Sequence, residues 1–231
     1  MTSRSIDIQA TDGKSFKGYL SLPPTGTGPG IILFQEIFGV NKHIRAVADQ
    51  YAQDGYVVLA PDMFWRTEPG VDIGYGEADM KTAMGLAQKM DFDQAVKDMS
   101  SAVNTLRALP ECTGKVASLG YCMGGFLSYL CAANGDVDAA VSYYPGRIGN
   151  RLELADKITA PILIHFAGKD HYIPKETVDA VKAAFANRKN AVIQVYQDAD
   201  HGFNCWERAV YDQKTSALAH GLTLSFLATA L

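Results

Sequence analysis

Three side chains suited to covalent catalysis, Cys122, Asp170 and His201, occur in that order along the sequence. A cysteine thiol can attack a carbonyl carbon, and a histidine can take the thiol proton and later activate water. An aspartate can hold the imidazole in one tautomer and stabilise its protonated form. Because each residue follows a stretch expected to form a strand, the pattern predicts a nucleophile, a base and an acid at one edge of a sheet.

The residues around Cys122 predict a sharp turn between a strand and a helix. Lys115–Leu119 is a short, mostly apolar run typical of a buried strand, and Phe126–Ala133 has a helical pattern. Between them, Gly120-Tyr121-Cys122-Met123-Gly124 has the G-x-C-x-G form of a nucleophile elbow, with cysteine in place of serine. This turn would set the thiol at a helix N-terminus, where free N–H groups favour an anion. The alternative is a small buried cysteine in a glycine-rich turn.

The other two members of the triad also have structural alternatives. Asp170 could be a turn residue after Gly168, and His201 could be a helix-entry residue in a polar loop. Four further histidines compete for the role of base: His43, His165, His171 and His220. The joint placement of nucleophile, acid and histidine, each at an expected strand end and in this order, favours the catalytic interpretation.

Glu36 lies where the chain leaves the apolar strand Ile31–Phe34, at the same expected sheet edge. There its charge would disfavour a thiolate on Cys122 until substrate arrives, whereas the helix dipole and His201 would favour one. The backbone N–H groups of Met123 and Ile37 are the expected oxyanion hole. The alternative role for Glu36 is a cap of the following helix.

Strands and helices alternate along most of the chain, which predicts an α/β fold: a single α/β-hydrolase domain over residues 1–231. The sheet is expected to be mostly parallel, with helices on both faces and an N-terminal antiparallel hairpin. Long irregular loops are expected at Met63–Gly76 and Pro145–Lys157. The expected strands are residues 5–22 (as the hairpin), 31–34, 56–60, 115–119, 139–144, 162–167 and 191–196, and the expected helices are 41–55, 77–89, 92–109, 126–133, 174–185 and one ending near 227.

The composition narrows the classes of function. The 231 residues are 48% hydrophobic and carry a net charge of −4, with no basic run that would suggest nucleic acid. No apolar run approaches the length of a transmembrane helix or forms a signal peptide, and the four cysteines lack metal-ligand spacing. A thiol nucleophile needs a reducing compartment. We therefore expect a cytoplasmic protein without metal or cofactor, acting on a small molecule as a monomer or small homo-oligomer.

The sequence resembles the dienelactone hydrolase (carboxymethylenebutenolidase) family from the first hairpin to the last helix. The matching motifs are Gln35-Glu36-Ile37-Phe38-Gly39-Val40-Asn41, Gly120-Tyr121-Cys122-Met123-Gly124-Gly125, Gly168-Lys169-Asp170-His171 with Pro174, and Ala199-Asp200-His201-Gly202-Phe203. The resemblance implies a Cys-His-Asp triad at Cys122, His201 and Asp170. It also implies that Glu36 holds the resting thiol neutral until substrate binds.

The chain departs from the family pattern where the substrate is recognised. The resemblance implies two arginines that bind a substrate carboxylate, and these positions are Met80 and Cys205 here. Lysine is not equivalent to arginine at a bidentate carboxylate site. The candidates to replace the two arginines are Arg66, Lys81, Arg147 and Arg208, and the residues expected to bind substrate are Phe38, Trp65, Arg66, Lys81, Tyr144 and Phe203.

Three functions remain open from the sequence. The first is hydrolysis of an ester or a dienelactone-like enol lactone through a cysteine nucleophile and a thioester acyl-enzyme. The second is an esterase or thioesterase that acts on a different acyl substrate. The third is a non-catalytic doubly wound domain that binds a nucleotide or flavin at the Gly124-Gly125 turn, although no phosphate-binding glycine motif accompanies that turn.

Overall fold

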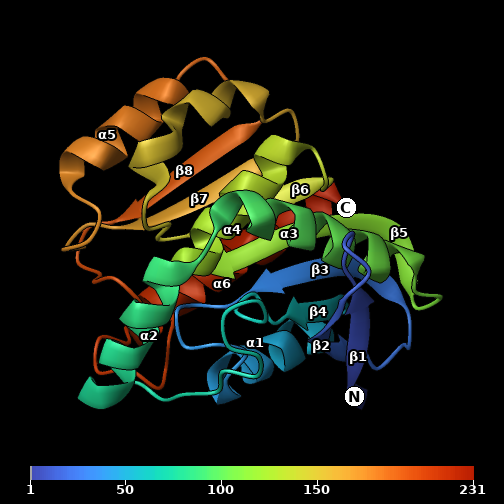
Figure 1. The fold of residues 1–231 in the computed structure, drawn as a ribbon. Coiled ribbons are helices and arrows are strands. Elements are labelled where there is room, and N and C mark those ends of the chain that lie inside the picture. The colour runs from blue at the N-terminus through green and yellow to red at the C-terminus, as the bar shows by residue number, and fades with distance from the viewer. Residues whose placement is uncertain (1) are drawn as a thin grey trace.

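The computed structural model describes residues 2–231 and contains one eight-stranded sheet. The strands follow the order β1-β2-β4-β3-β5-β6-β7-β8 across it (Figure 1). Neighbouring strands from β4 to β8 pair in parallel, while β1 and β2 are antiparallel. The strands are β1 (Thr2–Gln9), β2 (Ser15–Leu22), β3 (Gly28–Phe34), β4 (Val57–Pro61), β5 (Cys112–Tyr121), β6 (Ala139–Tyr143), β7 (Ile162–Ala167) and β8 (Ala191–Tyr196).

Helices cover both faces of this sheet. The helices α3 and α4 lie in front of the sheet in Figure 1 and contact each other, whereas α6 passes behind it. Helix α1 shares the α6 face, since His220 of α6 contacts the Asp54 carboxylate that ends α1, at 3.0 Å. The helices are α1 (Lys42–Gln53), α2 (Glu77–Lys89), α3 (Phe92–Ala108), α4 (Met123–Asn134), the 3₁₀ segment η1 (Ile148–Lys157), α5 (Lys175–Ala184) and α6 (Gln213–Ala230).

Local sequence signals explain where helices begin. Asn41 precedes α1 and accepts a hydrogen bond from the N–H of Ile44 at 3.1 Å. Asp91 does the same for α3, accepting from the N–H groups of Asp93 and Gln94. These contacts satisfy backbone donors that have no partner inside the helix.

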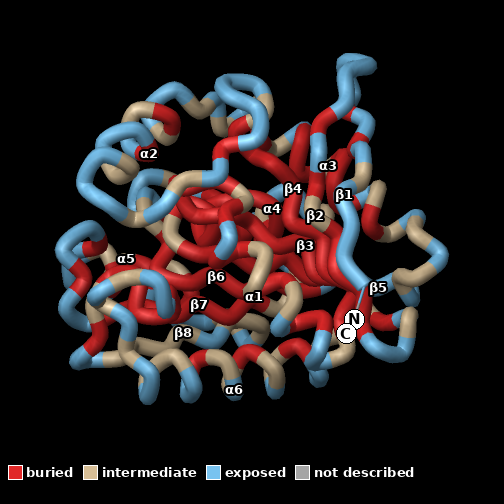
Figure 2. The backbone as a smooth tube through the Cα atoms, turned by 90° about the horizontal axis from the view of Figure 1, so that it is seen from below, coloured by how far each residue is buried: buried red, intermediate tan, exposed pale blue. Residues whose placement is uncertain are grey.

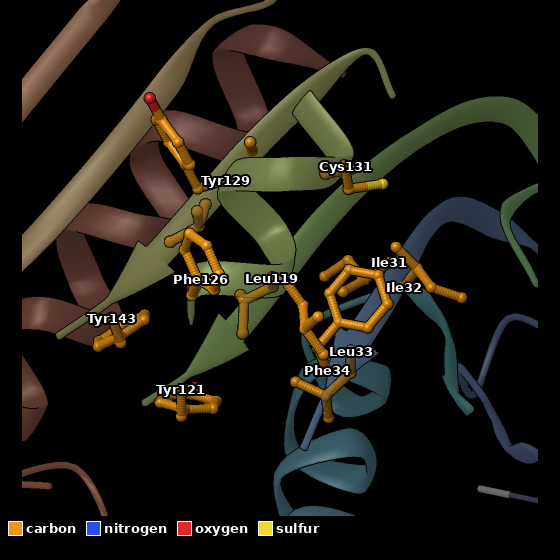
Figure 3. Close-up of a cluster of buried hydrophobic side chains, with 14 of the residues drawn as sticks. Ile31, Ile32, Leu33, Phe34, Leu119, Tyr121, Phe126, Tyr129, Cys131 and Tyr143 are labelled. Atoms are coloured by element: carbon orange, nitrogen blue, oxygen red, sulfur yellow. The ribbon is translucent and has the colours of Figure 1, made fainter. Parts of the chain in front are cut away.

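The core lies between the central strands and the helices on each face. Buried positions follow the strands in Figure 2, whereas α2 and the loops beside it are largely exposed. Figure 3 shows Ile31–Phe34 of β3 beside Leu119 of β5 and Phe126 of α4. Both faces of β3 are buried because the sheet is covered on both sides. Burying one such side chain contributes roughly 1.5–3 kcal/mol to the free energy of unfolding. The buried side chains of β3, β5 and α4 therefore contribute much of the stability of the fold.

The expected fold class is confirmed, and the differences are local. The stretch expected as a loop from Pro145 to Lys157 contains η1, whose turns pack against α4 and α5. Strand β5 begins at Cys112, and α4 begins at Met123, directly after the turn. In the sequence, glycines and polar residues near the start of β5 and of α4 indicated irregular structure. In the fold, contacts with neighbouring elements order these two ends. Within residues 2–231, no helix has the length and hydropathy needed to cross a bilayer.

Candidate active site

Cys122 occupies a strained turn between β5 and α4. It has φ 57° and ψ −115°, a conformation that L-residues rarely adopt. Its N–H donates to the carbonyl of Tyr143 on the neighbouring strand at 3.0 Å, which ties the turn to β6. The thiol is part of the lining of a cavity at the carboxyl end of the sheet.

The glycines on either side of Cys122 are required by close backbone contact. A Cβ at Gly120 would lie 2.0 Å from the carbonyl oxygen of Gly124. One at Gly124 would lie 2.2 Å from the carbonyl oxygen of Phe34 on β3. Only glycine fits both positions without a backbone shift, so the G-x-C-x-G spacing allows β3, β5 and α4 to meet under the thiol.

His201 and Asp170 form a buried pair at the ends of β8 and β7. Nδ1 of His201 lies 2.7 Å from Oδ2 of Asp170. The other oxygen, Oδ1 of Asp170, accepts hydrogen bonds from the backbone N–H groups of Tyr172 at 2.8 Å and Ile173 at 3.1 Å. These three contacts fix the carboxylate, which in turn orients the imidazole and leaves Nε2 for another partner.

The electrostatics of His201 couple it to Cys122. Burial by itself lowers the pKa of His201, but the negative charge of the Cys122 sulfur, a hydrogen bond to Asp170 and a hydrogen bond to Cys122 outweigh it. Together these interactions raise the pKa of His201 from 6.5 to about 10. A raised histidine pKa means that the protonated ring is stabilised, as in an imidazolium beside a thiolate.

Glu36 is 1% exposed and lies beside an arginine. Its Oε1 is 3.7 Å from Nη1 of Arg208, and its Oε2 accepts a hydrogen bond from the Tyr75 hydroxyl at 3.2 Å. Burial raises the pKa of Glu36, whereas the charges of Arg208 and His201 and the Tyr75 hydrogen bond lower it. Oε1 has no hydrogen-bond partner among the described residues, so this carboxylate keeps an acceptor free within the site.

Two backbone N–H groups are positioned to receive a negative oxygen. Met123 is the first residue of α4, and Ile37 lies in the turn after β3. Neither N–H makes a hydrogen bond within residues 2–231, and both residues line the same cavity as Cys122. Unpaired N–H groups beside a nucleophile are the usual donors of an oxyanion hole.

The cavity has a volume of about 260 Å³ and is lined mainly by apolar side chains. Helix α2 forms one wall with Met80, Met84 and Ala87, while Phe92 and Phe126 come from α3 and α4. Burial of the α2 helix is limited to Ala83 and Leu86, so few core contacts hold this wall in place. The remaining lining residues are Ile37, Phe38, Gln88, Cys122, Met123, Gly146, Arg147, Tyr172, His201 and Arg208.

The residues expected to bind substrate lie at different places relative to the cavity. Phe38 lines the cavity. Tyr144 and Phe203 are buried beneath it: the Tyr144 ring centroid is 4.9 Å from that of His201, and Phe203 lies 5.2 Å from Tyr144. The Tyr144 hydroxyl has no hydrogen-bond partner in the described chain. The Tyr144 ring therefore packs against the imidazole, and Phe203 packs against Tyr144.

Trp65, Arg66 and Lys81 lie outside the cavity lining. The Trp65 indole N–H donates to Asp98 at 2.9 Å, and Nε of Arg66 donates to the same carboxylate at 2.7 Å. Arg66 also contacts Asp12 at 2.8 Å. Both side chains are held on α3 and the first hairpin. The sequence showed their charge and aromatic character, but not the acidic partners that hold them there.

The apolar wall of the cavity was not expected from the sequence. Met80, Met84 and Ala87 recur at helical spacing on α2, a pattern that could have indicated one apolar face. It is indistinguishable in sequence from an ordinary core-facing stripe. Tyr172, which is 64% exposed, lies at the cavity with its ring 5.0 Å from that of His201, and no sequence signal marked it.

The other histidines have different surroundings. The ring nitrogens of His165 lie 3.1 Å from the Tyr196 hydroxyl and 3.0 Å from the Thr223 hydroxyl, and burial lowers its pKa to about 3. Burial lowers the pKa of His43 to about 4. His43, Glu36 and Cys205 form a buried group whose potential metal-ligand atoms lie within 4.8 Å of one another. Arg208 already places a positive charge beside Glu36 there, which opposes a cation.

Comparisons with known proteins show the family to which the chain belongs. Residues 16–231 match the dienelactone hydrolase family. The chain is 33% identical to a carboxymethylenebutenolidase of Pseudomonas putida and 31% identical to carboxymethylenebutenolidase 1 of Cupriavidus pinatubonensis, each over 99% of this chain and 97% of the relative. The crystal structure of a provisionally assigned dienelactone hydrolase from Klebsiella pneumoniae superposes with a TM-score of 0.86 at 28% identity, covering 99% of both chains. The chain belongs to the dienelactone hydrolase family, and it is a hydrolase of esters or lactones.

Proposed function

We propose that the protein cleaves an ester or a dienelactone-like enol lactone with Cys122 as the nucleophile, His201 as the acid and base, and Asp170 as the residue that orients His201. The observation that carries this proposal is the 2.7 Å contact between Nδ1 of His201 and Asp170, together with the coupling of His201 to the Cys122 sulfur. An aspartate, a histidine and a thiol at the ends of parallel strands are the parts needed for acyl transfer.

The reaction would proceed in two displacements. The Cys122 thiol gives its proton to His201 as its sulfur attacks the carbonyl carbon. The carbonyl oxygen becomes an oxyanion held by the N–H groups of Met123 and Ile37. The bond to the leaving oxygen breaks as His201 gives it a proton, which leaves a thioester. A water molecule then transfers a proton to His201 and attacks the thioester. The carboxylic acid is released, and His201 returns the proton to the Cys122 sulfur, which restores the thiol.

Glu36 would control the resting thiol through Arg208. The guanidinium of Arg208 interacts with the charges of both Glu36 and Cys122. While Glu36 is charged, it offsets the attraction that Arg208 exerts on a thiolate. A substrate that draws Arg208 away from Glu36, or neutralises Glu36, would change the charge felt by the sulfur.

A second candidate is an esterase or thioesterase that acts on another acyl substrate. The α2 wall of the cavity favours it, because Met80 and Met84 present thioether side chains there and the cations of α2, Lys81 and Lys89, are not in the lining. Methionines accommodate differently shaped apolar groups. Comparing turnover of enol lactones, acyclic aryl esters and thioesters distinguishes the two candidates: fast turnover of acyclic substrates with none of lactones selects the second.

The test of the shared mechanism is the Cys122→Ala variant. It should lose ester hydrolysis while its unfolding transition stays near that of the wild type, because alanine removes the sulfur and little packing. Cys131→Ala, on the far part of α4, is the matched control and should keep its activity. Iodoacetamide should modify Cys122 in step with the loss of activity. Near-normal turnover by Cys122→Ala would exclude the mechanism.

The four cysteines are all free thiols, and a catalytic thiol needs a reducing environment. We therefore propose that the reaction takes place in the cytoplasm, with a small-molecule ester or lactone as the substrate.

A further inference from the structure

The two edges of the sheet differ in how they are protected from pairing with other chains. Strands β1 and β8 form these edges, at opposite ends of the strand order (Figure 1). Strand β1 carries the charged residues Arg4 and Asp7, each in an ion pair of 2.8 Å. Strand β8 has the sequence Ala-Val-Ile-Gln-Val-Tyr, without a charge or a proline. Charges and prolines are common means of blocking a sheet edge, and β8 has neither.

Strand β8 is also exposed along its length. All six residues of the neighbouring strand β7 are buried, whereas none of the six residues of β8 is buried. The side chain that is most exposed on β8 belongs to Val192, which is 44% exposed. A strand of this composition in solvent is suited to pairing with a further strand.

The pairing of β8 with β7 determines which backbone groups of β8 point outward. The carbonyls of Asn190 and Tyr196 accept hydrogen bonds from the N–H groups before and after β7, at 2.8 Å and 2.7 Å. Alternate residues of a parallel strand bond to the same neighbour, so the even-numbered residues of β8 face β7. Ala191, Ile193 and Val195 therefore present their N–H and C=O groups to the outer side.

Two of these outward groups already have partners. The Ala191 N–H donates to the carbonyl of Arg188 at 3.4 Å, and the side-chain amide of Gln194 donates to the Val195 carbonyl at 3.3 Å. Within residues 2–231, the groups left on this strand edge are both groups of Ile193, the Val195 N–H and the Ala191 C=O. They are distributed symmetrically about Ile193.

Such an edge is complementary to a second copy of itself. In an antiparallel pair centred on Ile193, the two Ile193 residues exchange both of their backbone hydrogen bonds across a two-fold axis. The Val195 N–H of each copy then meets the Ala191 C=O of the other copy. All the free groups of the edge thereby find partners, in the self-complementary contact of a two-fold dimer.

The charges beside β8 favour the same antiparallel arrangement. Arg188 and Lys189 precede the strand, and Asp198 and Asp200 follow it. An antiparallel partner places the basic end of one copy beside the acidic end of the other, whereas a parallel partner would bring like charges together. The Asp198 side chain is 94% exposed and is therefore accessible to a partner.

Helix α6 next to this edge adds no charge that would oppose the contact. It packs against β6 and β7, and from Thr215 to Leu231 it has no aspartate, glutamate, lysine or arginine. A two-fold axis through Ile193 is perpendicular to the sheet, so α6 of each copy lies on the same face of the joined sheet. Leu218 of α6 is 58% exposed there.

We propose that the edge of β8 is an interaction surface for a second copy of this chain, and that two antiparallel β8 strands join the two sheets into one. Backbone hydrogen bonds at Ala191, Ile193 and Val195 hold the two copies, and Asp198 of each copy lies beside the basic residues of the other. This dimer does not depend on the reaction that Cys122 performs.

Sedimentation equilibrium of the full chain tests the proposal with a substitution that acts on the edge. The wild type should sediment with the mass of two chains. Ile193→Pro removes an outward N–H that the pairing with β7 does not use, so the dimer should be lost while the fold persists. Ile193→Val keeps the N–H and is the matched control, which should stay dimeric. Circular dichroism and thermal unfolding show whether Ile193→Pro is folded.

Reversing exposed charges provides a second test that leaves the backbone of β8 intact. Asp198→Lys and Lys189→Glu should each raise the Kd of the dimer about 10-fold, because the two-fold axis repeats each contact. The double variant should return the Kd toward that of the wild type. Glu68→Lys, the same kind of change on the exposed loop after β4, is the control and should leave the Kd unchanged.

Hydrogen exchange followed by NMR identifies the surface that forms the contact. The amide protons of Ile193 and Val195 should be protected in the dimer and should exchange faster on dilution. A wild type that sediments as a single chain at every concentration would overturn the proposal. A dimer in which these two amides exchange freely, or one that persists in folded Ile193→Pro, would overturn it as well. An unchanged Kd in both single charge variants would contradict the antiparallel arrangement.

Discussion

The His201 imidazole and the Cys122 sulfur behave electrostatically as one unit. Burial would keep an isolated imidazole neutral, yet the charge of Cys122 and the contacts with Asp170 raise the pKa of His201 to about 10. In the proposed mechanism His201 gives a proton to the leaving group in the first displacement and takes one from water in the second.

This pairing has a measurable consequence in the Cys122→Ala variant. Removing the sulfur removes its negative charge, so the pKa of His201 should fall, while Cys131→Ala should leave it unchanged. In the wild type, kcat/KM should decline as the pH rises toward about 10, because the imidazolium is lost there. NMR titration of the His201 ring measures the first effect. A His201 pKa that is equal in Cys122→Ala and the wild type would contradict the pairing.

Replacing Asp170 should lower kcat by more than the loss of its charge alone would. In Asp170→Asn the amide oxygen can still accept from the N–H groups of Tyr172 and Ile173, which turns the NH₂ group toward Nδ1 of His201. The ring is then held in the wrong tautomer, and kcat should fall by about 10⁴. Asp200→Asn, next to His201 in the sequence, is the control and should have a small effect. Initial-rate assays of both variants measure the two effects on kcat. A severe loss in Asp200→Asn, with little loss in Asp170→Asn, would show that Asp200 and not Asp170 is the acid of the triad.

Glu36 is expected to restrain the thiol. Glu36→Gln removes a negative charge and leaves Arg208 free to attract a thiolate, so both changes favour ionised sulfur. Iodoacetamide should then modify Cys122 faster near neutral pH than in the wild type. Glu207→Gln changes a neighbouring surface carboxylate that pairs with Lys42 and should leave the rate unchanged. An alkylation profile that moved to higher pH in Glu36→Gln would reduce Glu36 to a structural anchor.

At the scale of the elements, the turn from β5 into α4 has little room for change. Gly124→Ala would place a Cβ 2.2 Å from the Phe34 carbonyl oxygen, so β3 or α4 must move. We expect a loss of about 1–3 kcal/mol in the free energy of unfolding, together with reduced activity from a displaced Cys122.

The matched control is Gly85→Ala in α2, where an added Cβ meets no atom within 4 Å. Alanine in a helix interior should stabilise it by roughly 0.5–1 kcal/mol. Urea unfolding followed by circular dichroism measures both variants. A Gly124→Ala protein as stable as the wild type would show that the turn is less tightly packed than its contacts imply.

The elements that could be predicted from the sequence are those with strong local signals. The alternation of apolar runs, the caps at Asn41 and Asp91 and the glycines around Cys122 each specify structure within a few residues. The order of the segment Ile148–Lys157 depends instead on packing against α4 and α5. Such tertiary contacts leave no periodic mark in the sequence, and this segment was expected as a loop.

At the scale of the whole molecule, the site is assembled from segments far apart in the chain. The partner of Glu36 is Arg208, and Arg147 enters the same cavity from the loop after β6. The sequence could name these arginines as candidates but could not choose between them. Their selection depends on which acids neutralise the rest: Asp98 and Asp12 bind Arg66, and no carboxylate binds Arg147 within the described chain.

The protein carries a net charge of −4, but the lining of the cavity holds two arginines and no acidic residue. The charge distribution and the apolar α2 wall together define the kind of ligand that the fold admits.

The central claim is a covalent thioester on Cys122, and rapid-quench mass spectrometry tests it most directly. The wild type is mixed with a slowly deacylating 4-nitrophenyl ester, quenched in acid within milliseconds to seconds, and digested. We predict that the acyl mass appears on the peptide containing Cys122 as 4-nitrophenol is released, and that it decays at the rate of steady-state turnover. Turnover without an adduct, or an acyl group on any other residue, would contradict the account.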